Sequence, residues 1–263
     1  MLIAKTEAIA LRVEPFSKTS HVITWLAPDV GRFATLAKGV QRRRSLLQGQ
    51  FDIFYTCEVL YYTRAPRGLH ILKECASINP RQGFRDDWRK TTTASYLCDL
   101  ISHLCPPGSG HTGIYRLLER TLDDWEVRVP TPATLVWAEL RALEKSGFAP
   151  QLDCCTACGD PINSTAPAIF APDRGGLLCA RCVTPTDNRP AMPPDVLAML
   201  RAWQRDATPD MVRRTACQPS QEQSAARLLG AFLTYHLDPL PSSRAIALGL
   251  LYEGKKPGKR ISL

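Results

Sequence analysis

The chain has 263 residues, of which 44% are hydrophobic and 22% are charged, and this composition excludes a disordered or fibrous protein. The length allows about two domains, each able to bury its own core. A formal net charge of +8 favours a polyanionic partner, either nucleic acid or an acidic membrane surface.

The N-terminal stretch MLIAKTEAIALRVEPF contains Lys5, Glu7 and Arg12 among its apolar residues. It therefore lacks the apolar core of a signal peptide. No uncharged apolar run approaches the roughly 18 residues that a membrane span requires. We expect a cytoplasmic protein with no membrane partner, in a compartment where thiols stay reduced.

Residues 1–80 predict a small β-barrel. The segment HVITWLA at 21–27 alternates in the manner of a strand, and APDVGR at 27–32 supplies the Pro, Asp and Gly of a tight turn. Five strands in a segment of this size match the OB-fold, although periodicity does not distinguish it from an SH3-like barrel. The five predicted strands lie in EAIALRV, HVITWLA, RFATLAKGV, FDIFYTCEVLYYT and LHILKECASI.

Beyond about residue 87 the spacing of apolar residues becomes helical. One helix is delimited by Thr131 as N-cap, Pro132 as its first residue and Gly147 just past its end. In another, Ser220 and Gln223 predict a capping box. Further helices are predicted at 88–105, 111–127 and 193–206.

Two pairs of cysteines follow the pattern C-x2-C-x20-C-x2-C and predict a metal site. Each pair lets two thiolates approach one ion from a tight turn, and Cys155, Cys158, Cys179 and Cys182 would complete a tetrahedron. Four cysteine ligands leave no open position, so we expect one structural Zn²⁺ per chain. A dithiol redox site and disulfides remain alternatives. Cys154 is interpreted as a bystander.

The predicted fold class is α+β, with an N-terminal five-stranded OB-fold barrel followed by an all-helical domain that carries a four-cysteine zinc element. The helical domain is interrupted because the segment between its parts is rich in Pro, Gly and Cys and has little helical periodicity. The predicted parts are an OB-fold nucleic-acid-binding domain at 1–80, a first helical part at 81–150, a zinc-binding insert at 151–190, a second helical part at 191–250 and a basic tail at 251–263.

The stretch GRFATLAKGVQRRRSLLQGQF at 31–51 carries five cations and no acidic residue. In a five-stranded barrel it would occupy the third strand and the following loop, near the face where OB-folds bind a nucleic-acid backbone. Arginine can pair bidentately with phosphate. The alternative is a solvated charged loop over core aromatics. The five cations are Arg32, Lys38, Arg42, Arg43 and Arg44.

No catalytic constellation emerges, and we predict that the chain is not an enzyme. GSGHTG at 108–113 satisfies the pattern G-x-G-x-x-G, but LISHLCPP before it indicates the end of a helix rather than a strand. We therefore interpret GSGHTG as a helix connection. The five histidines show neither metal-binding nor triad spacing.

Taken in order, four motifs resemble the RecO family of bacterial DNA repair proteins: LAKGVQRRRS, LDCCTACG, GGLLCARC and FLTYHLDPLPSSR. The resemblance spans nearly the whole chain. It implies an N-terminal OB-fold and a helical domain with a zinc element. It also implies a recombination mediator that binds single- and double-stranded DNA, anneals complementary strands and, with RecR, helps load RecA onto strands coated by SSB.

By position, the resemblance implies that the four cysteines named above hold zinc and that the DNA contacts are made by Lys38, Arg42, Arg43 and Arg44. Arg32 is added to the DNA-binding set on charge alone. In this family the contact with the SSB C-terminal tail belongs to the helical domain, and Arg244 in PSSR is a candidate for it. The implied location is the cytoplasm, in association with the nucleoid.

Two other classes of function remain open. The first is a zinc-ribbon OB-fold protein that binds RNA, or a protein adaptor whose zinc merely shapes a docking surface. The second is an enzyme with a reactive dithiol or an open zinc. Competition between DNA and RNA strands would test the RNA-binding version, and metal analysis would test the enzyme.

Overall fold

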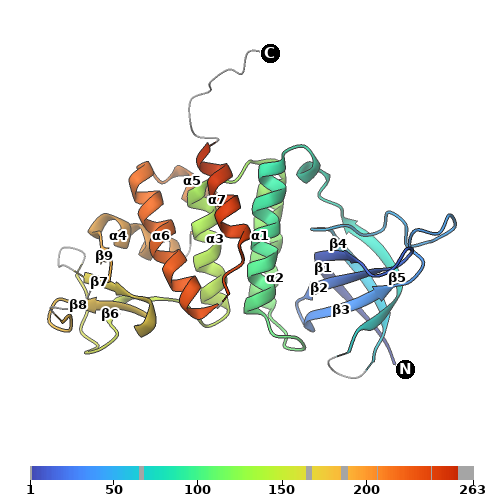
Figure 1. Cartoon of the computed structure of the whole chain (residues 1–263), viewed down its shortest axis with the longest axis horizontal. Helices are drawn as coiled ribbons and strands as arrows, with labels where there is room; N and C mark the ends of the chain where they lie inside the picture. Colours follow the sequence, from blue (N-terminus) through green and yellow to red (C-terminus); the bar gives the residue numbers. More distant parts are fainter. Residues whose placement is uncertain are drawn as a thin grey trace, which may run out of the picture. The chain divides into compact units, whose positions relative to one another are not determined.

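The computed structural model describes residues 2–64, 68–163, 168–184, 189–205, 207–237 and 239–253. The chain forms two compact units, Met1–Val129 (unit 1) and Pro130–Leu263 (unit 2). Figure 1 shows a barrel and helices in unit 1, and helices with a small sheet in unit 2. Among the described helices, none has the length and hydropathy needed to cross a membrane.

The five strands of unit 1 close into a barrel in the order β1-β2-β3-β5-β4, with β1 paired to both β2 and β4. β3 and β5 run parallel, and the other pairs are antiparallel. This arrangement confirms the predicted OB-fold and excludes the SH3-like alternative. The strands are β1 (Ile3–Pro15), β2 (His21–Ala27), β3 (Gly31–Ala37), β4 (Thr56–Tyr62) and β5 (His70–Asn79).

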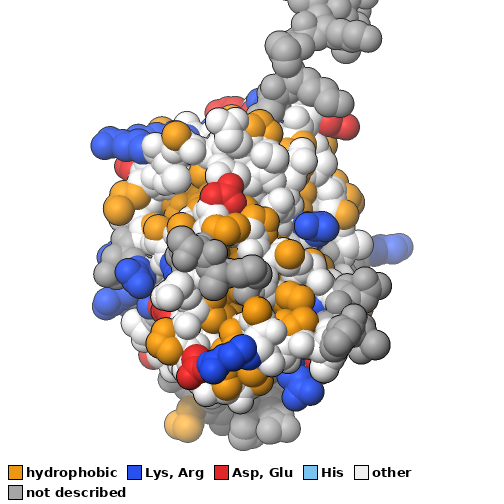
Figure 2. All heavy atoms as spheres, turned by 90° about the vertical axis from the view of Figure 1, so that its left-hand side faces the viewer, with side chains coloured by type: hydrophobic (Ala, Val, Ile, Leu, Met, Phe, Trp, Pro, Cys, Tyr) orange, Lys and Arg blue, Asp and Glu red, His pale blue; other side chains and the backbone are white. Residues whose placement is uncertain are grey.

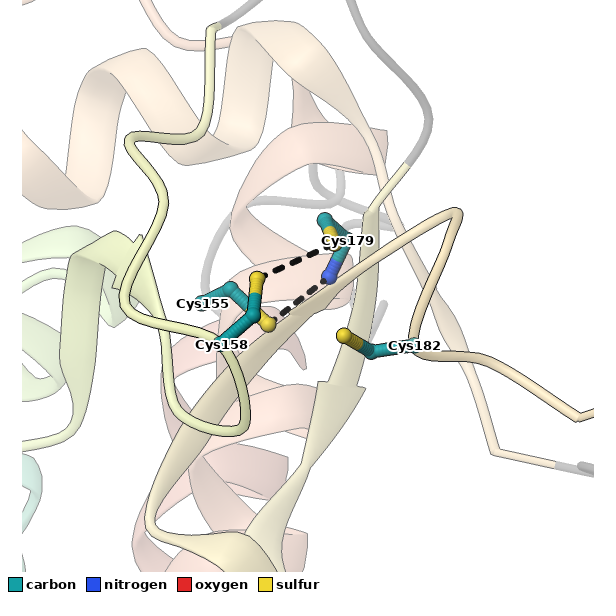
Figure 3. Close-up of side chains that lie close together, drawn as sticks. All are labelled: Cys155, Cys158, Cys179 and Cys182. Atoms are coloured by element: carbon teal, nitrogen blue, oxygen red, sulfur yellow. Dashed lines mark hydrogen bonds between the residues drawn. The ribbon is translucent and has the colours of Figure 1, made fainter.

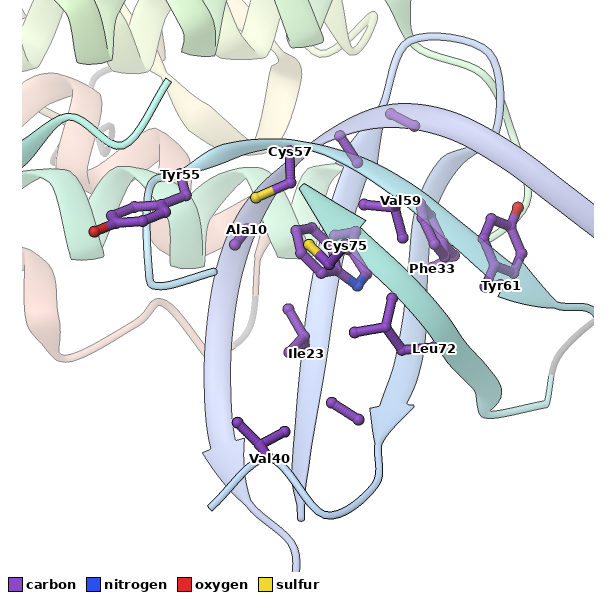
Figure 4. Packing of buried hydrophobic residues seen from close by; sticks show 14 residues of the cluster. Ala10, Ile23, Phe33, Val40, Tyr55, Cys57, Val59, Tyr61, Leu72 and Cys75 are labelled. Atoms are coloured by element: carbon purple, nitrogen blue, oxygen red, sulfur yellow. The ribbon is translucent and has the colours of Figure 1, made fainter. Parts of the chain in front are cut away.

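The barrel interior is filled by the inward-facing residues of these alternating strands (Figure 4). Phe33 stacks on Tyr61 with ring centroids 4.9 Å apart, and both side chains are buried. The buried indole of Trp25 donates a hydrogen bond to the Thr35 hydroxyl at 2.8 Å, so its polar atom is satisfied. These aromatic side chains belong to the core and are not stacking surfaces for bases.

The barrel is followed in unit 1 by a short 3-10 helix, η1 (Gln82–Arg85), and by α1 (Trp88–Leu104) and α2 (Thr112–Val127). Asp87 caps α1 by accepting a hydrogen bond from the Arg89 backbone N–H at 2.9 Å. The GSGHTG motif lies across the connection from α1 to α2, as predicted. The compact unit that contains the barrel continues to Val129. The domain boundary at residue 80 stays a prediction.

Unit 2 combines helices with a four-stranded sheet of order β6-β8-β7-β9. Its strands are β6 (Gln151–Cys155), β7 (Ala168–Ala171), β8 (Gly176–Cys179) and β9 (Ala191–Met192), with a 3-10 helix, η2 (Pro172–Arg174), between β7 and β8. Its helices are α3 (Pro132–Lys145), α4 (Pro194–Gln204), α5 (Pro209–Arg214), α6 (Pro219–His236) and α7 (Ser243–Glu253).

The structure confirms the predicted start of α3 and corrects that of α6. Thr131 caps α3 by accepting from the Thr134 backbone N–H at 3.2 Å. The capping box of α6 is formed by Gln218 and Gln221, not by Ser220 and Gln223. Because Pro219 has a fixed φ and no N–H, it is favoured as the first residue of the helix, which places the cap at Gln218, two residues before the predicted Ser220.

The sheet β6–β9, α5 and α7 were not predicted. The strands contain only two to five residues, which is too short for a clear alternation pattern. Part of the predicted basic tail also differs, because residues 251–253 complete α7. The rest of that tail, 254–263, lies outside the described residues.

A buried ion pair joins three helices of unit 2. Arg244 on α7 donates to both carboxylate oxygens of Glu139 on α3, at 2.7 and 2.9 Å, and to the Ala226 carbonyl on α6 at 2.9 Å. The Glu139 side chain is 0% exposed and that of Arg244 is 10% exposed. The geometry therefore assigns Arg244 to the packing of unit 2 rather than to an accessible tail contact.

Replacement of Gly230 by Ala should disturb this ion pair. A Cβ at Gly230 would lie 2.5 Å from Nη1 of Arg244, whose guanidinium is held in place by Glu139 and Ala226. We expect Gly230→Ala to lower the free energy of unfolding by about 1–3 kcal/mol in chemical denaturation.

Gly249→Ala on α7 is the matched control, because a Cβ there meets nothing within 4 Å. Alanine should raise stability at this exposed helical position by about 0.5–1 kcal/mol. Equal effects of the two substitutions would contradict the assigned role of Gly230.

Candidate nucleic-acid interface and metal centre

Residues 38–50, here called the basic loop, connect β3 to the segment before β4. The loop contains consecutive turns, with hydrogen bonds from Arg42 N to Gly39 O at 3.1 Å and from Ser45 N to Arg42 O at 2.9 Å. Its apolar residues Val40 and Leu47 pack against the barrel core. Val40 and Leu47 therefore anchor the loop, while its cations and Leu46 remain exposed.

The cations of the basic loop are exposed and uncompensated. Lys38, Arg42, Arg43 and Arg44 are all exposed, and none of them forms an ion pair with another described residue. Some other exposed cations of unit 1 have carboxylate partners, such as Lys5 with Glu58 at 2.9 Å. An unpaired cluster of one sign creates a positive potential that attracts a polyanion.

Lys18 joins this cluster through the connection between β1 and β2. Ser20 Oγ accepts a hydrogen bond from Gly39 N at 3.3 Å, and the Thr19 carbonyl accepts one from Gln41 N at 3.3 Å. Lys18 is exposed beside these contacts. A single lysine in a short connection carries no signal of its own, so sequence reasoning missed it.

Arg32 lies apart from the basic loop. It is six residues from Lys38 along an extended strand, which corresponds to about 20 Å. Its Nε donates to the Cys105 carbonyl at 2.9 Å, and its side chain lines a hollow of about 210 Å³ together with His70 and Gly108. The structure thus brings four of the five predicted cations together in one loop and places Arg32 near the other end of β3.

The four predicted cysteines come together at the ends of two neighbouring strands (Figure 3). β6 and β8 pair in parallel, with Cys155 opposite Leu177, so both strands end on the same side of the sheet. A turn follows each strand, closed by Gly159 N to Cys155 O and by Cys182 N to Cys179 O, both at 2.9 Å. Each turn returns the second cysteine of its pair toward the first.

The sulfur positions suit a tetrahedral metal ion. All four Sγ atoms lie within 4.8 Å of one another, and those of Cys158 and Cys179 are 3.7 Å apart. In a tetrahedral site with metal–sulfur bonds of about 2.3 Å, the sulfur atoms are separated by about 3.8 Å. A small contraction would therefore complete the site. Cys154 is not among the four sulfur atoms gathered here.

The protein favours negative charge at one position of this cluster. Burial acts to raise the pKa of the Cys155 thiol, but the backbone N–H groups of Cys179, Cys158 and Ala157 bring that pKa down to about 6. Hydrogen bonds with the sulfur atoms of Cys158 and Cys179 raise the pKa of Cys182 to about 12. A bound cation would relieve this competition by stabilising all four thiolates together.

One face of unit 2, over β6–β9, is shown in Figure 2. The Lys and Arg side chains that are drawn there lie in several separate groups among hydrophobic and acidic side chains. They do not form a continuous run of the kind found in the basic loop. The basic loop is accordingly the better candidate for binding a polyanion.

Comparison with known proteins identifies the family. Residues 1–81 match the family model described as "Recombination protein O N terminal", and residues 85–244 match the model described as "Recombination protein O C terminal". Together the two matches cover the barrel and most of the helical part of the chain.

Relatives along most of the chain carry the name DNA repair protein RecO. The protein from Syntrophus aciditrophicus is 31% identical over 194 residues, which is 73% of each chain. That from Anaeromyxobacter dehalogenans is 27% identical over 89% of this chain and 91% of the relative. That from Desulforudis audaxviator is 28% identical over 92% of this chain and 94% of the relative. With both its terminal parts matched, the chain belongs to the RecO family of DNA repair proteins.

Proposed function

We propose that this protein is a mediator of DNA repair and homologous recombination. It binds single- and double-stranded DNA, anneals complementary strands and helps load a recombinase onto strands coated by SSB. The observation that carries this proposal is the basic loop, an anchored segment with four exposed cations and no described carboxylate paired to them. Family membership supports the connection to DNA repair.

The basic loop suits binding that does not depend on sequence. Arginine and lysine contacts to phosphates release condensed counterions, and this release drives association with any strand. Arg42, Arg43 and Arg44 are consecutive, so they can contact neighbouring phosphates or phosphates of two strands. Neutralising both backbones lowers the repulsion that opposes pairing, which is the electrostatic requirement for annealing.

The four cysteines are proposed to hold one structural Zn²⁺. Four thiolates at tetrahedral spacing match the preference of zinc and leave no position for substrate or water. The ion would join β6 to β8 in a sheet whose strands are too short for strong pairing alone. In this proposal zinc stabilises unit 2, and the protein acts by binding rather than by catalytic turnover.

The proposed protein partners are RecR and the SSB C-terminal tail, with RecA reached indirectly. They are proposed from the RecO family resemblance, as is a cytoplasmic location in association with the nucleoid. The contact with the SSB tail is proposed for the helical domain as a whole, since Arg244 is already paired with Glu139.

Removing the arginines of the basic loop should flatten the salt dependence of DNA binding. For single strands the slope of log K against log salt is about −0.7 per neutralised phosphate, so replacing Arg42, Arg43 and Arg44 by Ala should reduce its magnitude by about 2. Fluorescence anisotropy with a labelled single strand at several salt concentrations measures this slope.

A control with the same loss of charge replaces Lys5, Arg12 and Lys73 by Ala. These side chains are already paired, with Glu58, Asp99 and Glu74 respectively. The control should change the slope much less. If both triple variants reduce the slope equally, the basic loop contributes only general charge. If the slope of the Arg42, Arg43 and Arg44 variant is unchanged, the basic loop is not the DNA interface. Competition with RNA of equal length then tests the RNA-binding alternative.

Annealing of complementary strands that have been coated with SSB tests the mediator activity itself. The wild-type protein should accelerate duplex formation, measured by loss of donor fluorescence between end-labelled strands. The triple variant of the basic loop should be slower at the same protein concentration. No acceleration by the wild-type protein would reject annealing, whatever the DNA affinity.

Replacement of one cysteine ligand should remove the metal. We expect about one zinc per wild-type chain, retention in Cys154→Ser and loss in Cys158→Ser, measured by elemental analysis and by the stability of unit 2. Because protons compete with zinc for thiolates, lowering the pH should also release the ion. Zinc loss in Cys154→Ser with retention in Cys158→Ser would show that the ligand set is wrong.

A further inference from the structure

A second hollow of unit 1, here called the Trp88 pocket, lies between the segment before β4 and the beginning of α1. Its volume is about 390 Å³, within the range of small-molecule sites. Four aromatic side chains line it: Phe54, Tyr55, Phe84 and Trp88. Phe54 and Phe84 pack with ring centroids 4.7 Å apart and form a rigid apolar wall.

Trp88 differs from every other tryptophan of the chain. It is 61% exposed, whereas the other four tryptophans are each at most 3% exposed. Trp88 is the first residue of α1, so its backbone is held by the helix while its ring remains open to solvent. An exposed tryptophan beside an aromatic hollow is typical of a surface that binds a flat ligand.

Backbone strain is concentrated at the same place. Among the described residues, Phe54 and Arg81 are the two non-glycine residues with positive φ, at 71° and 39°. Both line the Trp88 pocket. The Arg81 guanidinium donates to the Phe54 carbonyl at 2.7 Å and thereby holds this unfavourable conformation. Strain of this kind is characteristic of functional sites.

The polar groups of the pocket form a neutral rim. Arg85 pairs with Asp52 at 3.0 Å and also donates to the Tyr55 hydroxyl at 3.2 Å. The Asp52 carboxylate can accept hydrogen bonds from the amino groups of a base, and the Arg85 guanidinium beside it can donate to the carbonyls of a base. Because the charges of this pair cancel, the rim offers no particular attraction to phosphate. Its chemistry fits a nucleobase.

We propose that the Trp88 pocket binds an unpaired base of the single strand whose phosphates lie along the basic loop. This inference rests on the proposed function and adds a second point of contact to it. The pocket follows the loop directly along the chain, since Asp52 lies two residues beyond residue 50. Stacking on Trp88 accepts any base, which suits a protein that binds strands of any sequence.

The pocket also distinguishes single strands from duplexes. Bases in a duplex are stacked and paired, so entering the pocket would require unstacking at a cost of a few kcal/mol. The basic loop contacts phosphates in both forms. The pocket should therefore strengthen binding to single strands alone.

Intrinsic tryptophan fluorescence tests the proposal directly, because Trp88 is exposed and the other four tryptophans are buried. A thymidine oligonucleotide should quench the emission of the wild-type protein, while a strand of abasic sites with the same number of phosphates should bind without quenching it. Trp88→Phe should still bind thymidine strands but lose the quenching.

Trp88→Ala should weaken binding of the thymidine strand about five-fold to 150-fold and leave duplex binding unchanged, as measured by anisotropy. Tyr235 is an aromatic residue of unit 2 that is 57% exposed, so Tyr235→Ala is the matched control. It should change neither the affinity for the thymidine strand nor that for the duplex. The proposed base site would be overturned if the wild-type protein binds strands in a salt-dependent manner without quenching and Trp88→Ala binds with full affinity. That result would leave the proposed function intact and would favour a protein partner at this surface. If the wild-type protein binds no strand, the proposed function and the base site are both rejected.

Discussion

Unit 1 depends on the buried guanidinium of Arg81. Its side chain is 1% exposed and donates to the Phe54 carbonyl, the Thr56 hydroxyl and the Asp123 carboxylate. Removing a partner of a buried charge lowers the free energy of unfolding by about 3–5 kcal/mol. The three groups that accept hydrogen bonds from Arg81 are therefore held at fixed positions. Since Thr56 begins β4 and Asp123 belongs to α2, Arg81 joins the barrel to α2. Exposed pairs such as Arg12 with Asp99 add further links.

Arg81 holds Phe54 in the Trp88 pocket, and other hydrogen bonds hold the basic loop. Backbone hydrogen bonds between Ala10 on β1 and residues 54 and 55, at 2.8 and 2.9 Å, hold the chain where it leaves the basic loop. Ser20 and Thr19 hold the loop where it begins. Cations on a loop held at both ends lose less conformational freedom on binding than cations on a free tail.

Much of this architecture could be predicted because its signals are local. Inward- and outward-facing residues alternate clearly in the strand at 21–27, and the spacing of the four cysteines within two short motifs predicts their site. What could not be predicted depends on pairing between distant segments. Lys18 lies beside the basic loop because its neighbours Thr19 and Ser20 accept hydrogen bonds from Gln41 and Gly39. Arg32 lies apart from the loop because an extended strand separates it from Lys38. Trp88 has no sequence signal, since its exposure follows from how α1 meets the barrel.

The two clusters of chemically active side chains in this protein therefore differ in what they leave unsatisfied. At the cysteines, the backbone N–H groups of Cys179 and Ala157 and three further sulfur atoms surround Cys155, so a single tetrahedral ion would use all four thiolates and leave none of them for another ligand. At the basic loop, turns and apolar anchors satisfy the backbone, but no described carboxylate pairs with the cations. Unpaired cations on an anchored loop keep their full attraction for a polyanion, and this supports the proposal that DNA binds at the loop rather than at the metal site.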